Sequence, residues 1–91
     1  MVHYDIKITG RVQGVGFRSF VKQKAEQNGI LGWVKNETDG SVHVKALGEE
    51  KDMETFLDYL NIGPSMARVK NISKYKIDSG GEYKGFSLKY F

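Results

Sequence analysis

The apolar residues of this chain change their spacing several times, and the order of these changes limits the folds that it can form. Over residues 2–9, apolar and polar residues alternate, which predicts a β-strand with one buried face. Over residues 17–25, the apolar residues instead recur at helical spacing, and Gly29 follows where such a helix would end. The chain therefore opens with a strand, a loop and an amphipathic helix.

A predicted hairpin and a second helix come next. Residues 33–37 and 42–46 have the composition of two strands, and Thr38-Asp39-Gly40 between them is typical of a tight turn. Residues 53–60 repeat the helical spacing. They follow a group of acidic residues, which suit the positive end of a helix dipole. We expect a hairpin followed by a helix that packs on the same sheet.

The last third of the chain contains two more predicted strands. Gly63-Pro64 ends the second helix, strand composition returns over residues 69–77, and a glycine turn at 78–82 leads to an alternating segment at 86–90. The order βαββαβ with a short extra C-terminal strand predicts a ferredoxin-like α/β sandwich. This is an α+β fold with one antiparallel sheet and both helices on one face. We expect residues 1–91 to form a single domain, since the chain is too short for two cores.

Composition narrows the chemistry and the location. The chain contains no cysteine, which excludes disulfides, thiolate nucleophiles and cysteine-ligated metals. No apolar run approaches the ~20 residues that cross a bilayer, and the N-terminus lacks a secretory pattern, so we expect a cytoplasmic protein that does not contact a membrane. The net charge of +3 favours an anionic ligand but does not identify one, and most lysines are expected to solvate the surface.

The segment from Gly10 to Arg18, GRVQGVGFR, joins the first strand to the first helix. Its three glycines tolerate positive φ, which lets successive backbone N–H groups form an anion-binding nest. The helix start adds unpaired N–H groups, and residues 15–17 include no capping side chain. Arg18 lies in the first turn, where the helix dipole disfavours a cation. A bound anion accounts for both features; the alternative is that the glycines only turn the chain and Arg18 only reaches solvent.

Asn36 is the second polar residue that we expect at this edge of the sheet. In the predicted topology the first two strands run parallel on either side of the third, so their ends lie about 10 Å apart at ~4.8 Å per strand. Period two places Asn36 on the same face as Val34, toward the first helix. A buried amide is unfavourable there unless it is hydrogen-bonded. Asn36 is therefore either a structural amide bonded to loop backbone or an amide directed at the same corner as Arg18.

Taken jointly, these motifs resemble the acylphosphatase family. The matching residues are GRVQGVGFR, Ala25, Gly29, GWVKN at 32–36, DGSV at 39–42 and Gly48. Members of this family are small ferredoxin-like enzymes that hydrolyse carboxyl-phosphate mixed anhydrides. The resemblance therefore implies a small-molecule acyl phosphate as substrate, with a carboxylate and inorganic phosphate as products. Departures are slight: Lys35 stands where arginine is frequent, and Gly16 occupies a variable position.

The same resemblance implies roles for particular residues. Arg18 is expected to bind the phosphate, and Asn36 is expected to orient the attacking water. The residues that it assigns to the phosphate-binding site are Gly10, Arg11, Val12, Gln13, Gly14, Val15, Gly16 and Arg18.

Phosphoryl transfer from an acyl phosphate makes modest demands on a site. The leaving carboxylate is stable, so no general acid is required, and catalysis is mainly positioning and charge stabilisation. No positioned base is evident, because His3 and His43 are expected on the polar, exposed faces of their strands, and a substrate phosphate oxygen can accept the proton. The sequence contains none of the usual metal-ligand clusters, so we expect neither a metal nor another cofactor.

The main alternative is an RNA-binding module. Residues 84–91, KGFSLKYF, partly imitate the RNP1 motif of RNA-recognition domains, which share the βαββαβ order. That motif belongs on the third strand, which here reads SVHVKAL and has no aromatic residue. Alternation instead assigns Phe86 and Tyr90 to the core with Leu88. A non-catalytic anion-binding module is a further alternative, but we expect a monomeric enzyme that binds no nucleic acid.

Overall fold

The computed structural model describes residues 1–78 and 80–90. Ser79, in the predicted glycine turn, and Phe91, the last residue of the segment that imitates RNP1, lie outside the described residues. The elements are, in chain order, β1 (Val2–Arg11), α1 (Phe17–Gln27), β2 (Leu31–Asn36), β3 (Val42–Gly48), α2 (Glu50–Ile62), β4 (Arg68–Lys76) and β5 (Phe86–Lys89). This confirms the predicted βαββαβ order with its additional C-terminal strand.

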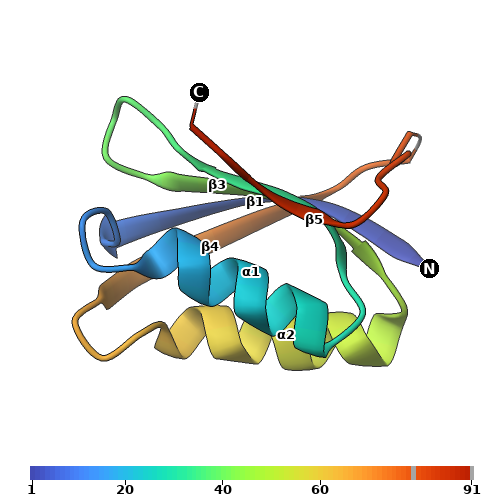
Figure 1. The fold of residues 1–91 in the computed structure, drawn as a ribbon, viewed down its shortest axis with the longest axis horizontal. Coiled ribbons are helices and arrows are strands. Elements are labelled where there is room, and N and C mark those ends of the chain that lie inside the picture. The colour runs from blue at the N-terminus through green and yellow to red at the C-terminus, as the bar shows by residue number, and fades with distance from the viewer. Residues whose placement is uncertain (79, 91) are drawn as a thin grey trace.

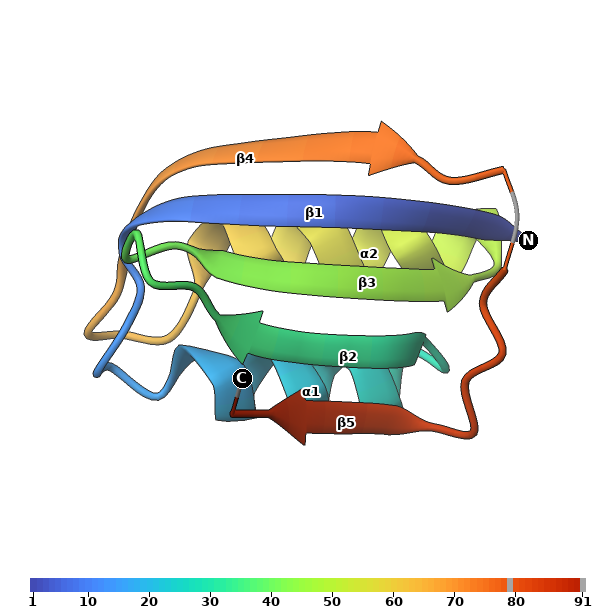
Figure 2. The same ribbon diagram turned by 90° about the horizontal axis from the view of Figure 1, so that it is seen from above.

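The strands form one sheet of five, in the order β4-β1-β3-β2-β5. β1 pairs antiparallel with both β3 and β4, and β2 pairs antiparallel with β3. β5 runs parallel to β2, so the sheet is mixed rather than wholly antiparallel as predicted. β4 and β5 lie at opposite edges of the sheet and β5 begins at the end where β4 ends, so β5 runs antiparallel to β4 and hence parallel to β2 (Figure 2).

Both helices cover the same face of the sheet, as predicted, and leave the other face open (Figure 1). Each helix presents an apolar stripe to the sheet, consisting of Phe17, Val21 and Ala25 on α1 and of Met53, Phe56 and Leu60 on α2. These side chains pack in one core cluster with strand residues that include Ile6, Ile8, Val34 and Val44. The ferredoxin-like sandwich is therefore built from the periodicities of the sequence.

Neither α1 nor α2, the helices of the described residues, has the length and apolar character needed to cross a bilayer.

Two side chains lie in environments other than those predicted. His3 is only 7% exposed, because Tyr83 covers it and the two side chains are hydrogen-bonded at 2.7 Å. Tyr90 follows the last residue of β5 and is 74% exposed rather than part of the core. Phe86 and Leu88 do pack against the core as predicted. Both differences come from the tertiary course of the C-terminal segment, which strand periodicity does not encode.

β2 begins at Leu31, two residues before the predicted start, and so includes Gly32. Gly32 has a φ of +142°, and a Cβ at this position would lie 1.8 Å from the backbone oxygen of Lys45 on β3. Glycine is required here because the two backbones approach too closely for any side chain.

The edge of the sheet where β1 ends brings distant segments together. β1, β2 and β5 all end at this edge, and α1 begins there (Figure 2). The parallel arrangement of β1 and β2 on either side of β3, which the sequence predicted, is what places the glycine loop beside Asn36.

Candidate active site

The loop between β1 and α1 is shorter than the sequence indicated. β1 continues through Gly10 and Arg11, which pair with Val69 and Arg68 on β4, so the loop comprises residues 12–16. All three glycines have the positive φ that was predicted, at 123° for Gly10, 73° for Gly14 and 77° for Gly16. Gly14 and Gly16 turn the backbone within the loop itself, where such φ values let N–H groups point inward.

The start of α1 carries unpaired backbone donors. Gly16 occupies the N-cap position in a left-handed conformation, no side chain caps the helix, and no acidic residue lies in the first turn. The Phe20 N–H donates to the Gly16 carbonyl at 3.1 Å, so the N–H groups of residues 16–19 have no acceptor within the helix. These donors and the positive end of the helix dipole make the helix start suitable for an anion.

A pocket of about 120 Å³ lies at this helix start. Its lining residues come from the loop, the first turn of α1 and the end of β2, and they are Val12, Gly14, Gly16, Phe17, Arg18, Ser19 and Asn36. The volume is about four times the ~30 Å³ that one water occupies in the liquid. The pocket therefore has space for a phosphoryl group and is walled by hydrogen-bond donors.

The structure brings some of the sequence-assigned residues to this pocket and leaves others outside it. Arg18, Asn36, Val12, Gly14 and Gly16 line it. The other residues assigned by resemblance lie elsewhere: the β1 residues Gly10 and Arg11, together with Gln13 and Val15. Phe17 and Ser19 line the pocket without having been predicted. Their position in the first turn of the helix was the available signal, since every early helix residue offers an N–H group.

Asn36 is the last residue of β2 and pairs with Val42 on β3. Its Oδ1 atom is buried and has no hydrogen-bond partner among the residues that the structure describes. A buried acceptor without a partner costs about 1–3 kcal/mol. The structural alternative, in which this oxygen is satisfied by loop backbone, is therefore not observed, and the oxygen can accept a hydrogen bond from a ligand or water.

Arg18 is held from the side by the C-terminal segment. Its Nη1 donates to the Lys89 carbonyl at 3.2 Å, and its Cζ lies 4.9 Å from the centroid of the Tyr90 ring. A guanidinium has five N–H donors, so one bond to Lys89 leaves others for a phosphate. Sequence reasoning missed both contacts, because they depend on β5 lying beside β2 and no local pattern signals that pairing.

A second hollow, of about 310 Å³, lies between α2 and β4 and suits an anion less well. It is lined by Glu54, Leu57, Asp58, Asn61, Ile72 and Lys74. Its two carboxylates would repel a phosphate. Within residues 1–78 and 80–90, no group of three histidine, aspartate or glutamate side chains is arranged to hold a metal ion.

The fold and the pocket together define a ferredoxin-like α/β sandwich in which the uncapped start of α1 lines one pocket with Arg18 and Asn36. The acylphosphatase family profile matches residues 4–88. The acylphosphatase of Oceanobacillus iheyensis is 43% identical to this chain over 91 residues, which are 99% of this chain and 100% of that protein. The chain belongs to the acylphosphatase family.

Solved structures agree with this assignment. The crystal structure of acylphosphatase from Bacillus subtilis superimposes with a TM-score of 0.95 at 39% identity and covers 99% of this chain and 100% of that chain. The structure of an acylphosphatase from Coxiella burnetii gives a TM-score of 0.91 at 34% identity and covers 97% of this chain and 92% of that chain. The chain is accordingly a hydrolase that acts on small-molecule acyl phosphates, and the RNA-binding alternative is not supported.

Proposed function

We propose that the pocket at the start of α1 is the catalytic site and that acyl phosphates are cleaved there without a metal or other cofactor. Arg18 and the backbone N–H groups of the loop and helix start bind the phosphoryl oxygens, while Asn36 orients the attacking water. The observation that carries this proposal is that Arg18 and Asn36, from separate elements, line one pocket together with Gly14 and Gly16.

Binding and charge stabilisation come first. The phosphoryl oxygens accept hydrogen bonds from the N–H groups of residues 16–19, which lack acceptors within the helix. Arg18 adds a planar pair of donors that matches two phosphoryl oxygens. Charge on these oxygens is stabilised in the transition state by donors that are already in place, which is the main requirement of phosphoryl transfer.

The attack itself requires a positioned water. The buried Oδ1 of Asn36, which has no partner among the described residues, accepts one hydrogen bond from that water. The water oxygen forms a bond to phosphorus as the bond from phosphorus to the acyl oxygen breaks. The carboxylate leaves with the electron pair, and a proton of the water passes to a phosphate oxygen, so that inorganic phosphate is the second product. This path uses neither a side-chain base nor a general acid.

We propose further that residues 1–91 act as one domain and as a monomer in the cytoplasm, without binding nucleic acid. The modest net charge supports the absence of nucleic-acid binding. The single core cluster, which contains the buried apolar residues of the described chain, supports one domain. Light scattering on the purified chain tests the oligomeric state, and a band-shift assay with single-stranded RNA at low salt tests nucleic-acid binding.

The decisive experiment measures phosphate release from acetyl phosphate and benzoyl phosphate in the presence of a chelator. We expect the wild type to remain active, Arg18→Ala to lose both substrate binding and turnover, and Asn36→Ala to lose chiefly kcat. The matched controls are Arg68→Ala and Asn71→Ala, which remove the same side chains from exposed positions on β4. Both controls should stay within about twofold of the wild type, since neither residue lines the pocket.

Two outcomes would contradict the proposal. Full activity in folded Arg18→Ala and Asn36→Ala would place the chemistry elsewhere. Loss of wild-type activity in chelator, with recovery on adding a divalent cation, would refute the metal-independent mechanism.

A further inference from the structure

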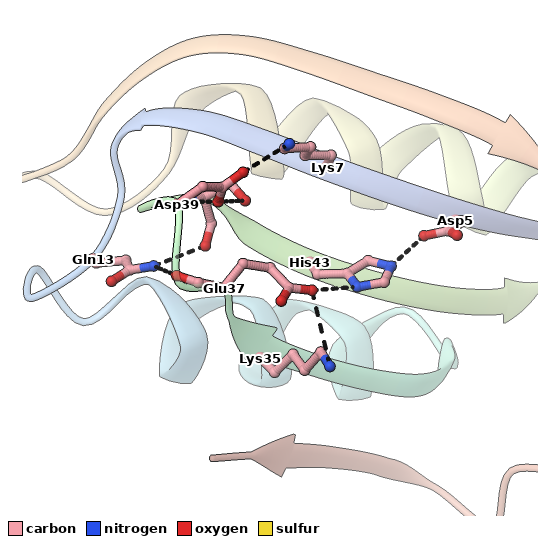
Figure 3. Close-up of polar contacts among 8 residues, drawn as sticks. Asp5, Lys7, Gln13, Lys35, Glu37, Asp39 and His43 are labelled. Carbon is pink, nitrogen blue, oxygen red and sulfur yellow. Dashed lines mark hydrogen bonds and ion pairs between the residues drawn. The ribbon is translucent and has the colours of Figure 1, made fainter. Parts of the chain in front are cut away.

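Gln13 belongs to the loop that lines the pocket, but its side chain is bonded elsewhere. The Gln13 amide nitrogen donates to the backbone oxygen of Glu37 at 2.8 Å and to that of Ser41 at 2.9 Å (Figure 3). These two acceptors lie at the two ends of the turn between β2 and β3. Gln13 is not among the residues that line the pocket, and its side chain instead connects the loop to this turn.

The turn that accepts these hydrogen bonds from Gln13 begins directly after Asn36. Glu37 is the next residue, and its N–H donates to the Ser41 carbonyl at 2.9 Å. The two bonds from Gln13 therefore connect the loop to the backbone of Glu37, the residue directly after Asn36, and to that of Ser41. Because the Asn36 side chain is the final one of β2, its distance from the loop depends on this connection.

The side chain of Glu37, the first residue of the turn, is bonded to the sheet through His43 on β3. The His43 ring lies between two carboxylates, with Nδ1 2.9 Å from Glu37 Oε2 and Nε2 hydrogen-bonded to Asp5 on β1 (Figure 3). Polar contacts thus hold Glu37 against β1 and β3.

The middle of the turn is fastened as well. Asp39 accepts a hydrogen bond from the Ser41 hydroxyl at 2.6 Å and pairs with Lys7 at 2.9 Å. The Ser41 hydrogen bond and the Lys7 ammonium hold the pKa of Asp39 well below its usual range. Several polar contacts therefore hold the turn in place. The Gln13 hydrogen bonds connect it to a loop that contains two glycines with positive φ.

We propose that Gln13 is a positioning residue. It sets the distance between Asn36 and the phosphate cradle, which consists of Arg18 and the N–H groups of residues 16–19, and it thereby governs turnover rather than phosphate binding. This inference rests on the roles proposed above for Arg18 and Asn36. The cradle donors and Arg18 belong to one continuous segment, the loop and the first turn of α1. The water-orienting amide belongs to β2, and the bonds from Gln13 link the two groups.

The first test replaces Gln13 by leucine, which has similar bulk but no donor. We expect Gln13→Leu to lower kcat for acetyl phosphate about 10- to 100-fold, since a shift of about 1 Å in a reacting group costs up to ~100-fold. The Kd of inorganic phosphate should change less than about threefold, because the backbone donors and Arg18 are retained. Gln23→Leu, the same change at an exposed position of α1, is the control and should behave as the wild type.

The second test is a double-mutant cycle that separates positioning from stability. If Gln13 acts through Asn36, adding Gln13→Leu to Asn36→Ala should lower kcat no further than about twofold. Gln13→Glu keeps the shape of the side chain, removes its donors at neutral pH and serves as a second variant if Gln13→Leu folds poorly. Thermal melting of each variant shows that the measured kcat belongs to folded protein.

Three results would overturn the inference. The first is an unchanged kcat in both folded Gln13 variants, and the second is a double variant whose loss of kcat equals the product of the two single losses. The third is weaker binding of phosphate at constant kcat, which would make Gln13 part of the cradle. The roles of Arg18 and Asn36 are judged separately, because their single variants and the wild type are measured in the same assay. Inactive wild type would refute those roles without involving Gln13.

Discussion

Tyr90 offers a quantitative test of how Arg18 is held. Its ring lies 4.9 Å from the Arg18 Cζ and is 74% exposed, which is the setting in which a cation–π contact contributes about 0.5–1 kcal/mol. Since about 1.36 kcal/mol corresponds to a factor of ten in an equilibrium constant, losing this contact should change the binding constant about two- to fivefold. The Lys89 carbonyl continues to accept from Arg18, because it is a backbone group. Tyr90→Ala should therefore weaken phosphate binding about two- to fivefold.

The assay is calorimetric titration with inorganic phosphate, together with KM for benzoyl phosphate. Tyr90→Phe keeps the ring and should match the wild type. Tyr75→Ala removes an equally exposed tyrosine on β4, at 70% exposure, and should have no effect. Unchanged affinity in Tyr90→Ala would show that the ring does not restrain Arg18, and a loss above about 20-fold would show a far larger role than an exposed cation–π contact has.

Gly32→Ala should lower the free energy of unfolding by about 3 kcal/mol or more in urea, because the added Cβ would clash with the backbone of β3. Gly40→Ala should cost only about 1–2 kcal/mol, for the positive φ alone, because its added Cβ has no atom within 4 Å. Equal losses in the two variants would refute this reasoning. The Ser41 hydrogen bond lowers the pKa of Asp39 from its ordinary 3.8, so this contribution to stability is present above that pH and is lost as the pH falls below it. Urea midpoints of Asp39→Asn should accordingly fall less on acidification than those of the wild type, and parallel pH profiles would contradict this. Inorganic phosphate at 100 times its Kd should raise the unfolding free energy by about 2.7 kcal/mol, and Arg18→Ala should respond far less at the same concentration in thermal melts; an equal response would remove Arg18 from the anion site.

The glycine loop was predictable because its physical signals are local. Positive φ at Gly14 and Gly16, the uncapped helix start and the cation in its first turn all depend on neighbouring residues alone. The meeting of Arg18 with Asn36 was predictable one level higher, since element order implied that β1 and β2 run parallel around β3. That step required only the periodicity of the strands and the usual topology of this order.

The predictions that failed concern the C-terminal segment and the ends of strands. Tyr90 was placed in the core by alternation, but β5 ends one residue earlier and the ring turns out to Arg18. Gly10 and Arg11 were assigned to the loop, yet pairing with β4 keeps them in β1. In each case the outcome depends on a partner that is about 60 to 70 residues away along the chain, and no local pattern encodes it.

Local residue patterns were sufficient to predict the element order, the ferredoxin-like class, the uncapped helix start after the glycine loop and the family to which the chain belongs. Those properties follow from periodicity, glycine positions and motif residues, which act over a few neighbours. The tertiary structure alone decided that β5 joins parallel to β2, that Arg18 rests on Lys89 and Tyr90, and that Gln13 bridges to the turn after Asn36. These contacts join segments far apart in the chain, so they exist only once the sheet has brought the segments to the same edge.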